Sequence, residues 1–305
     1  MSADPAAESA TSDEAAAPDA SNHHYDLPPQ IFELFLDTSL KYSVGLFESE
    51  DDSLEEAQIR KMEYIERVLQ LTPGARVLDA GCGWGSLTLF LAARGYHVTG
   101  ITPSPSQADF VEGRARASGI EDRVTILRGV FEDQDLPAGR FNGITFVGSI
   151  VHMPDKRAIL ARSNKLLAKR GRLYLSETCF SNAKRYQQFK DGAEFGFIRD
   201  EIFGWGDCVP VSSYVADLEA TGFSLCGLRD LTPHYLCTIA EWRRRAARNR
   251  EAIEALRPGY TDQLLRYFDI CNTSWGFTTK QYAVVAVRDR GRHLPGKRPG
   301  TSQDN

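Results

Sequence analysis

The chain has 305 residues, of which 42% are hydrophobic and 25% charged, so it can bury one large core without requiring two independent domains. Its formal net charge of −5 gives no electrostatic reason to expect a nucleic acid as partner. No stretch approaches the roughly 20 apolar residues of a membrane-spanning helix, and the first residues lack the charged-then-apolar pattern of a secretion signal. We therefore expect a cytoplasmic protein without a transmembrane segment.

The two ends of the chain differ in composition from the rest. Residues 1–22 are rich in Ala, Ser, Asp and Glu and lack aromatic residues, which predicts a disordered acidic tail. Residues 291–305 are rich in glycine, proline and basic residues, which predicts a disordered basic tail. We expect one folded domain over residues 23–290, and its first part, residues 23–70, is predicted to form a helical cover.

The six cysteines indicate neither a metal site nor a disulfide framework. They show no Cys-x-x-Cys spacing and do not cluster with histidine. Free thiols in a reducing compartment fit this pattern. The sequence therefore predicts no metal ligands.

A short apolar strand at residues 76–78 runs directly into a loop with glycine at 81, 83 and 85, followed by a predicted helix over 86–93. Such a loop lets a ligand approach the backbone, and dinucleotide-binding folds use a similar one against a pyrophosphate. Asp79 stands directly before the glycines, where a carboxylate would repel a pyrophosphate but can hold the ammonium group of an amino-acid cofactor. This is the pattern of class I S-adenosylmethionine (SAM) methyltransferases. The alternative is a glycine-rich turn capped by Asp79.

The next strand-like stretch, residues 96–102, lacks a feature of nucleotide-binding enzymes. Those enzymes usually end this strand in an acid that binds the ribose hydroxyls, and no acid stands here. Thr102 and Gln107 can supply neutral hydrogen bonds instead. A NAD-dependent dehydrogenase is disfavoured for this reason and because Asp79 precedes the glycines.

Strand-like and helix-like stretches continue to alternate, with further strands expected at residues 124–127, 143–147 and 172–175. The alternation predicts an α/β, Rossmann-like fold with a mainly parallel sheet, helices on both faces and ligands at the carboxyl ends of the strands. Residues 281–287 are predicted as an antiparallel edge strand. Residues 180–245, which open with a segment rich in aromatics and glycine, are predicted to form a lid region on the acceptor side.

The chain resembles the cyclopropane-fatty-acid synthase family of SAM-dependent methyltransferases, which includes the mycolic acid cyclopropane synthases. The resemblance rests on separated motifs in the family order: His-Tyr-Asp-Leu at 24–27, Tyr-Ser at 42–43, Ser-Leu-Glu-Glu-Ala-Gln at 53–58, Leu-Asp-Ala-Gly-Cys-Gly-Trp-Gly at 78–85, Val-Thr-Gly-Ile-Thr at 98–102, Glu-Ile-Phe at 201–203, Pro-His-Tyr at 233–235 and Trp242. It implies a class I SAM-methyltransferase fold and an enzyme that converts SAM to S-adenosylhomocysteine (SAH).

The resemblance also assigns residues to the cofactor. An N-terminal segment closes over SAM, the glycine loop contacts its methionine part, and the ends of the second and third strands contact its ribose and adenine. The corresponding residues here are Tyr42 and Ser43; Gly81 and Gly83; Thr102, Pro103 and Gln107; and Val130 and Phe131. For Tyr42 the alternative is an aromatic residue packed in the core beside Phe47.

The resemblance breaks at the bicarbonate site. The cyclopropane synthases that the chain resembles hold a bicarbonate base with Cys, Glu, His and Tyr side chains. The corresponding positions in this sequence are Val44, Val151, Ser176 and Tyr235. Valine offers no donor that could hold a desolvated anion. We therefore expect no bicarbonate in this site.

Three residues are candidates for the chemistry. His152 matches a histidine that the plant N-methyltransferases of the family use near the acceptor, and its near-neutral pKa suits a general base. Glu177, at the end of the next strand, is a second candidate that the family pattern does not supply. Tyr235 can orient the acceptor or stabilise a cation with its ring face. The alternatives are a backbone hydrogen bond for His152, a cap for Glu177 and a loop contact for Tyr235.

The first hypothesis for function is methyl transfer to carbon or nitrogen of a hydrophobic small molecule. Methylation or cyclopropanation of an unsaturated fatty-acyl lipid is the enzymatic alternative, and a non-catalytic SAM-binding protein is the alternative from another class. The arginine-rich stretch at residues 243–250 is interpreted first as a solvated helix face. The alternative interpretation is a surface for peripheral contact with anionic lipid. The sequence does not indicate an oligomeric state.

Overall fold

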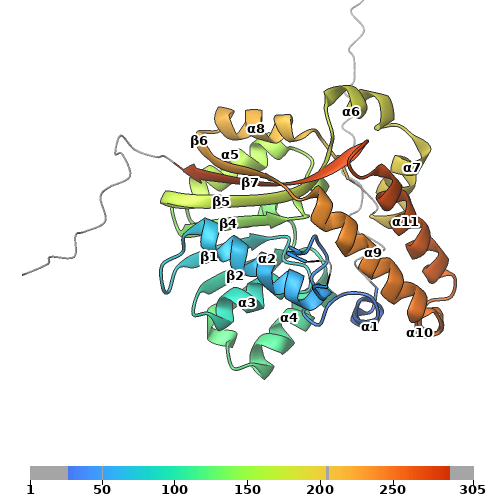
Figure 1. The fold of residues 1–305 in the computed structure, drawn as a ribbon. Helices are drawn as coiled ribbons and strands as arrows, with labels where there is room; N and C mark the ends of the chain where they lie inside the picture. The colour runs from blue at the N-terminus through green and yellow to red at the C-terminus, as the bar shows by residue number, and fades with distance from the viewer. Residues whose placement is uncertain (1–26, 50, 204–205, 289–305) are drawn as a thin grey trace, which may run out of the picture.

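The computed structural model describes residues 27–49, 51–203 and 206–288, so the predicted tails, 1–22 and 291–305, lie outside the described residues. Figure 1 shows a twisted sheet with helices on both faces and a further group of helices at one end. The strand order is β3-β2-β1-β4-β5-β7-β6. The strands are β1 (Arg76–Ala80), β2 (His97–Thr102), β3 (Val124–Arg128), β4 (Phe141–Val147), β5 (Leu167–Phe180), β6 (Phe223–Asp230) and β7 (Thr279–Arg288).

The first five strands are parallel, and β7 runs antiparallel to both of its neighbours. The predicted antiparallel strand at 281–287 is therefore present, but it lies one place in from the edge. The edge is β6, whose residues lie within the predicted acceptor-side region 180–245. The alternation of its side chains is weak because most of them are partly or fully exposed.

Two cores cover the two faces of the sheet, as strand alternation requires. Val77 and Val285 face one core with α2 (Leu54–Leu69) and α3 (Ser86–Ala93). Leu78 and Val284 face the other with α5 (Lys156–Leu166) and α8 (Val211–Ala220). This arrangement confirms the predicted α/β fold with helices on both faces. The remaining helix beside the sheet is α4 (Pro105–Ala117).

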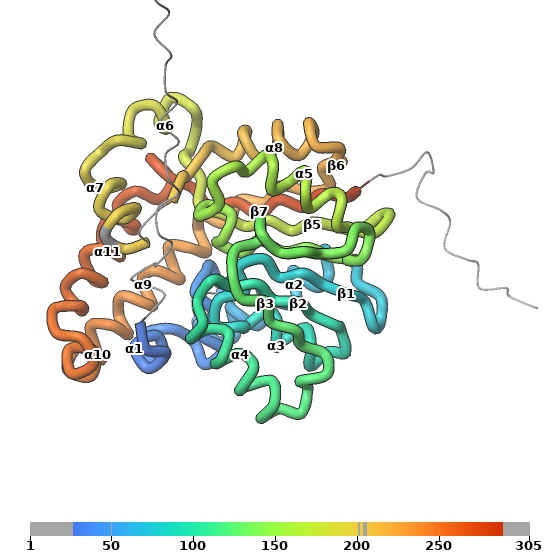
Figure 2. Tube along the Cα trace, turned by 180° about the vertical axis from the view of Figure 1, so that it is seen from behind, coloured from blue at the N-terminus to red at the C-terminus, as the bar shows by residue number. Residues whose placement is uncertain are grey.

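A third, aromatic core lies at the end of the sheet where the parallel strands finish. Figures 1 and 2 show α9 (Thr232–Arg248), α10 (Arg250–Leu256) and α11 (Tyr260–Ser274) gathered there with α1 (Pro29–Glu33). Phe32, Trp242 and Phe268 are fully buried among these helices. The cover at this end is thus shared between the N-terminal segment and the C-terminal helices, while α2 packs against the sheet.

The acceptor-side region begins with short helices. They are α6 (Ala183–Phe189), α7 (Ala193–Gly196) and a π-helical turn, η4 (Phe197–Ile202). Single-turn 3-10 helices occur elsewhere: η1 (Glu121–Arg123) directly precedes β3, η2 (Phe131–Asp133) follows β3, and η3 (Ile150–His152) follows β4. Of the predicted region 180–245, α8 and β6 belong to the layers of the sheet, and the parts near 181–208 and the start of α9 lie at the strand ends.

Candidate active site

The glycine loop follows β1 and is held against β2. The backbone N–H groups of Gly81 and Cys82 both donate to the carbonyl of Ile101, at 3.0 and 2.9 Å. Gly81 has φ of +81°, and a Cβ there would stand 2.4 Å from the Cβ of Ser149. Gly85 is equally restricted, since a Cβ would stand 2.5 Å from Val111. The loop therefore requires glycine for its backbone conformation and for the close approach of α4 and of Ser149, which follows β4.

Asp79 is buried at the end of β1, and both of its oxygens accept hydrogen bonds from hydroxyl groups. Thr88 Oγ1 on α3 and Thr145 Oγ1 on β4 each lie 2.8 Å from one carboxylate oxygen. The carboxylate thus joins β1, β4 and the helix after the glycine loop. Each oxygen retains acceptor capacity, so the predicted contact with an ammonium group stays compatible with this geometry and stays a prediction.

The residues predicted for the ribose and adenine lie at the ends of β2 and β3. Thr102 donates to Oε1 of Gln107 at 2.7 Å, and both side chains are buried beside Pro103. Val130 is exposed, whereas Phe131 packs against Phe146 in the core with ring centroids 5.6 Å apart. A contact of adenine with position 131 would therefore involve the backbone, and the side-chain contact would come from Val130.

The Tyr42–Ser43 segment crosses the carboxyl end of the sheet. Tyr42 packs on Trp242 with ring centroids 5.0 Å apart, and it also contacts Phe32 and Phe35. Ser43 is buried, and Gln58 Nε2 on α2 donates to its backbone carbonyl at 2.7 Å. Tyr42 and Ser43 both line the cavity described next. Tyr42 is therefore both a core aromatic, as in the alternative prediction, and part of the cavity wall.

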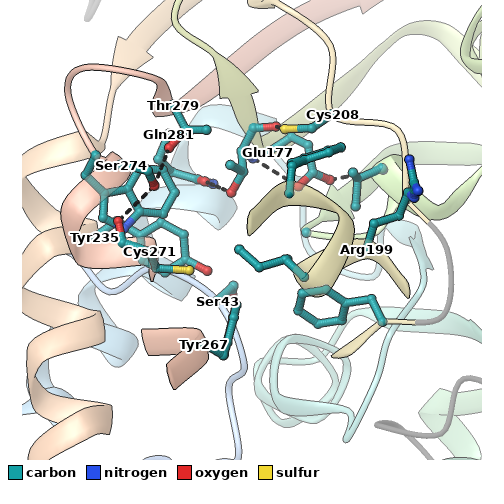
Figure 3. Close-up of a pocket in the computed structure, with 18 of the residues that line it drawn as sticks. Ser43, Glu177, Arg199, Cys208, Tyr235, Tyr267, Cys271, Ser274, Thr279 and Gln281 are labelled. Atoms are coloured by element: carbon teal, nitrogen blue, oxygen red, sulfur yellow. Dashed lines mark hydrogen bonds between the residues drawn. The ribbon is translucent and has the colours of Figure 1, made fainter. Parts of the chain in front are cut away.

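One cavity brings together Tyr42, Ser43 and all three predicted catalytic residues, His152, Glu177 and Tyr235. Figure 3 shows Ser43, Glu177 and Tyr235 around this hollow, each from a different element. The wall is largely aromatic and apolar. The other lining residues are Gly148, Val151, Thr178, Phe195, Ile198, Arg199, Phe203, Gly206, Cys208, Tyr267, Cys271, Ser274, Trp275, Thr279 and Gln281.

Glu177 is the one carboxylate among the described residues that line the cavity. It is 3% exposed and accepts hydrogen bonds from the backbone N–H groups of Thr178, at 3.0 Å, and Val151, at 3.3 Å. Burial raises its pKa to about 7, and these two hydrogen bonds and the charge of Lys156 oppose the increase only in part. A carboxylate with such a pKa can accept a proton near neutral pH.

His152 and Tyr235 stand at other parts of the wall and are held by aromatic rings. His152 ends η3, and its ring centroid lies 5.5 Å from that of Phe203. Tyr235, in the first turn of α9, lies 4.7 Å from the ring of Trp275 and 6.0 Å from that of Trp242. The structure thus places all three predicted catalytic side chains in the wall of one cavity, and their roles stay predictions.

Three of the residues at the positions expected for bicarbonate ligands make other contacts in this structure. Val44 is fully buried in the core beneath α2. Ser176 accepts a hydrogen bond from Gln281 Nε2 at 3.2 Å. At position 151 the backbone N–H donates to the Glu177 carboxylate. A protein carboxylate therefore stands beside the position where the family has its own glutamate.

Several wall residues were not predicted from the sequence. Tyr267, Cys271 and Ser274 come from α11, and Thr279 and Gln281 come from β7. They lie more than a hundred residues from the glycine loop, and no motif marks them. The spacing of 267, 271 and 274, which places residues on one face of a helix, is the signal that could have grouped the first three.

The arginine-rich stretch is largely paired with acids. Arg243 contacts Asp269 at 2.6 Å, and Arg245 contacts Glu241 at 2.7 Å and Glu55 at 2.8 Å. Further pairs join Arg244 to Glu241 and Arg250 to Asp262. These contacts favour the solvated helix face over a lipid-binding patch. In the part of the chain that the structure describes, no helix is long and apolar enough to cross a membrane.

The sheet order, the glycine loop after β1 and the cavity at the strand ends are those of a class I SAM-dependent methyltransferase fold. Within that class, residues 12–286 match the family model described as mycolic acid cyclopropane synthetase, so the chain belongs to that family. The predicted family, fold class and SAM dependence are thereby confirmed, and the protein is an enzyme of the methyltransferase type.

Similar proteins agree with this assignment. Cyclopropane mycolic acid synthase MmaA2 of Mycobacterium tuberculosis is 33% identical over 261 residues, which cover 81% of this chain and 89% of the relative. A probable fatty acid methyltransferase of Pseudomonas putida is 31% identical over 82% of this chain and 64% of its own length. The crystal structure of mycolic acid cyclopropane synthase CmaA1 with SAH and CTAB has a TM-score of 0.82 and 26% identity, covering 88% of this chain and 96% of that one.

Proposed function

We propose that this enzyme transfers the methyl group of SAM to the double bond of an unsaturated fatty-acyl chain, giving a methylated or cyclopropanated product. The observation that carries the proposal is the buried carboxylate of Glu177, the one acid among the described residues that line a largely aromatic and apolar cavity, which also includes Tyr42 and Ser43. An alkene is an apolar nucleophile, and it needs an apolar wall and one base. The related cyclopropane mycolic acid synthases and the probable fatty acid methyltransferase support this acceptor class over the small-molecule acceptor that we expected first.

The chain's own residues would act after the alkene attacks. SAM supplies an electrophilic methyl carbon; the alkene π electrons form the new carbon–carbon bond while the sulfur keeps the electrons of the broken bond and leaves as SAH. The ring faces of Tyr235 and Trp275 would stabilise the resulting carbocation. Glu177 would take the proton that the cation must lose. Loss from the new methyl group closes a cyclopropane ring, and loss from a neighbouring carbon leaves a methylated alkene.

Glu177 is the preferred base because its oxygens lie inside the cavity wall and its pKa is raised to about 7. His152, which directly follows the Val151 whose N–H contacts Glu177, would orient the acceptor or relay the proton. The carboxylate would thus supply within the chain the basic group that bicarbonate supplies in the cyclopropane synthases. No bicarbonate is needed in this scheme.

The test is product mass spectrometry with methyl-deuterated SAM and two separate acceptor pools, unsaturated phospholipids and small metabolites extracted from the source organism. An acyl product that retains three deuterium atoms indicates methylation, and one that retains two indicates ring closure. Label that enters only the small metabolites would refute the acyl proposal. The same preparation without protein is the control.

The aromatic residues of the same wall favour a second acceptor class. A wall of Tyr42, Tyr235, Tyr267 and Trp275 with one carboxylate is also the chemistry that recognises an ammonium group. A hydrophobic amine would fit such a wall, and Glu177 or His152 would accept its proton. Three deuterium atoms on a nitrogen of a small metabolite would select this class.

A further inference from the structure

Two buried lysines lie under the segment that covers the SAM site. Lys61, on α2, is fully buried, and Lys41 is 5% exposed. Lys61 Nζ donates to the hydroxyl oxygen of Ser43 at 2.5 Å. One helical turn earlier, Gln58 Nε2 donates to the backbone carbonyls of Ser43 and Lys41, at 2.7 and 3.3 Å. One face of α2 therefore holds both the backbone and the side chain of Ser43.

The two ammonium groups have acids nearby but are not in contact with them. Among the described residues, no ion pair within 4.0 Å joins either lysine to a carboxylate. The carboxylates whose negative charges act on both lysines are Asp37 and Asp79. Asp79 accepts from Thr88 and Thr145, and Asp37 accepts from the backbone and hydroxyl groups of its own turn. Buried charge without a direct partner is costly, so a further anion at this place would be stabilised.

The arrangement at Ser43 determines which way its proton points. A serine hydroxyl has one proton to donate and two lone pairs. Because the ammonium of Lys61 occupies a lone pair, the hydroxyl proton is left for a partner on another side, and Ser43 lines the cavity. A hydroxyl that accepts from a cation is a stronger donor.

SAM has one anionic group, the carboxylate of its methionine part. We propose that Lys61 is a positioning residue that holds and polarises Ser43 so that the Ser43 hydroxyl donates to this carboxylate. Lys61 acts through Ser43 and, with Lys41, adds positive charge behind the carboxylate. Asp79 lies within the same group of charges and suits the ammonium end. The cluster of two acids and two cations thus complements a zwitterion.

Burial acts on Lys61 in the direction that a bound carboxylate would oppose. Burial and the charge of Lys41 lower the pKa of Lys61 well below its ordinary value, while Asp37 and Asp79 partly oppose the change. A carboxylate bound at Ser43 would favour the charged form further. The proposal depends on SAM as cofactor and not on the identity of the methyl acceptor.

The test compares two ligands by isothermal titration calorimetry. SAH carries the amino-acid part, and 5′-methylthioadenosine carries the same adenosine and thioether without it. We expect Lys61→Met to weaken SAH binding by about 10- to 100-fold, the range for a hydrogen bond to a charged group, and to leave methylthioadenosine binding within about twofold. Equal weakening of both ligands, or no change for SAH, would overturn the proposal.

Three further variants separate the roles. Arg67→Met, an exposed cation on the same helix, is the matched control and should bind SAH as the parent does. Ser43→Ala should weaken the binding of SAH but not that of methylthioadenosine. Adding Lys61→Met to Ser43→Ala should reduce SAH affinity little further; full additivity of the two losses would show that Lys61 does not act through Ser43. Lys61→Gln retains a donor toward Ser43 and should fall between parent and Lys61→Met, so it decides the question if Lys61→Met does not fold.

Discussion

The cofactor side and the acceptor side of this site satisfy their buried polar groups in different ways. On the cofactor side, Asp79 is held by two threonine hydroxyls and Thr102 by Gln107, so side chains satisfy one another. On the acceptor side, the hydrogen bonds that Glu177 accepts within the described part of the chain come from backbone N–H groups, and its pKa rises to about 7. The first arrangement suits the binding of one ligand, and the second keeps a carboxylate that we propose as the base at a cost in desolvation.

The largest effect should come from crowding the cofactor side. Gly81→Ala places a Cβ 2.4 Å from the Cβ of Ser149, at a φ of +81°. Crowding of this kind costs about 1–3 kcal/mol and the backbone conformation about 1–2 kcal/mol. The loop must shift, and we expect SAH affinity to fall by about 100-fold or more. Calorimetric titration with SAH measures this.

Gly95→Ala is the matched control for that variant. Its φ is also positive, at +92°, but apart from its two chain neighbours no described residue has an atom within 4 Å of the new Cβ. It should lose some stability and retain SAH affinity. Unchanged binding in Gly81→Ala would mean that the loop can move without cost, and the view of a fixed cofactor side would be wrong.

The next effect concerns the acceptor side alone. Glu177→Gln keeps the size and the hydrogen-bond acceptor but cannot take a proton, so we expect turnover to fall by about 100-fold. SAH binding should not change, because Glu177 lies on the acceptor wall. Turnover with the acceptor found by mass spectrometry and SAH titration test the two halves of this prediction. Retained turnover would move the role of base to His152.

The pH profile sharpens the same prediction. A base must be deprotonated to act, so turnover should rise with pH through about 7 and then level off. In Glu177→Gln this rise should disappear. A rise that persists in Glu177→Gln and disappears in His152→Gln would assign it to the histidine.

Glu177→Gln should have a smaller effect on folding stability, and this effect should be a gain, whereas turnover falls. An acid whose pKa is raised on folding binds more protons in the folded state between pH 4.5 and about 7, so its contribution is most favourable below 4.5 and is lost as pH rises through 7. Glu177→Gln should therefore be about 1–3 kcal/mol more stable than the parent at pH 8, with little difference at pH 4.5. Denaturant unfolding at the two pH values measures this, and lower stability at pH 8 would contradict the desolvation argument.

The cofactor side could be predicted from the sequence because its residues are local. Asp79, Gly81 and Gly83 follow one strand, and Thr102 and Gln107 follow the next, so a strand-loop-helix pattern places them at one edge of the sheet. The acceptor side is assembled from η3, β5, β7, α9 and α11. For Tyr267 or Gln281 only the tertiary packing decides which side chains face the cavity. The position of β7 inside the sheet also depended on β6, whose exposed face gave little alternation.

The buried lysines were missed for a related reason. A Lys on a predicted amphipathic helix is ordinarily assigned to the solvated face, and neither Lys41 nor Lys61 belongs to a motif that marks it. Their burial follows from the way the Tyr42–Ser43 segment crosses α2. A role for Lys61 could therefore be inferred only once its contact with Ser43 was known.

The smallest effect should lie on the outer surface of α9, outside both sides of the site. Arg243 and Arg244 are paired with Asp269 and Glu241, and exposed pairs of this kind contribute about 0–1 kcal/mol. The double variant Arg243→Ala with Arg244→Ala should keep its turnover and its stability within that range. It should also sediment with phosphatidylserine vesicles to the same extent as the parent, because acids already neutralise these cations. If the double variant sedimented less than the parent, these arginines would bind anionic lipid. The lipid-binding surface would then include the outer face of α9, opposite the cavity at Tyr235.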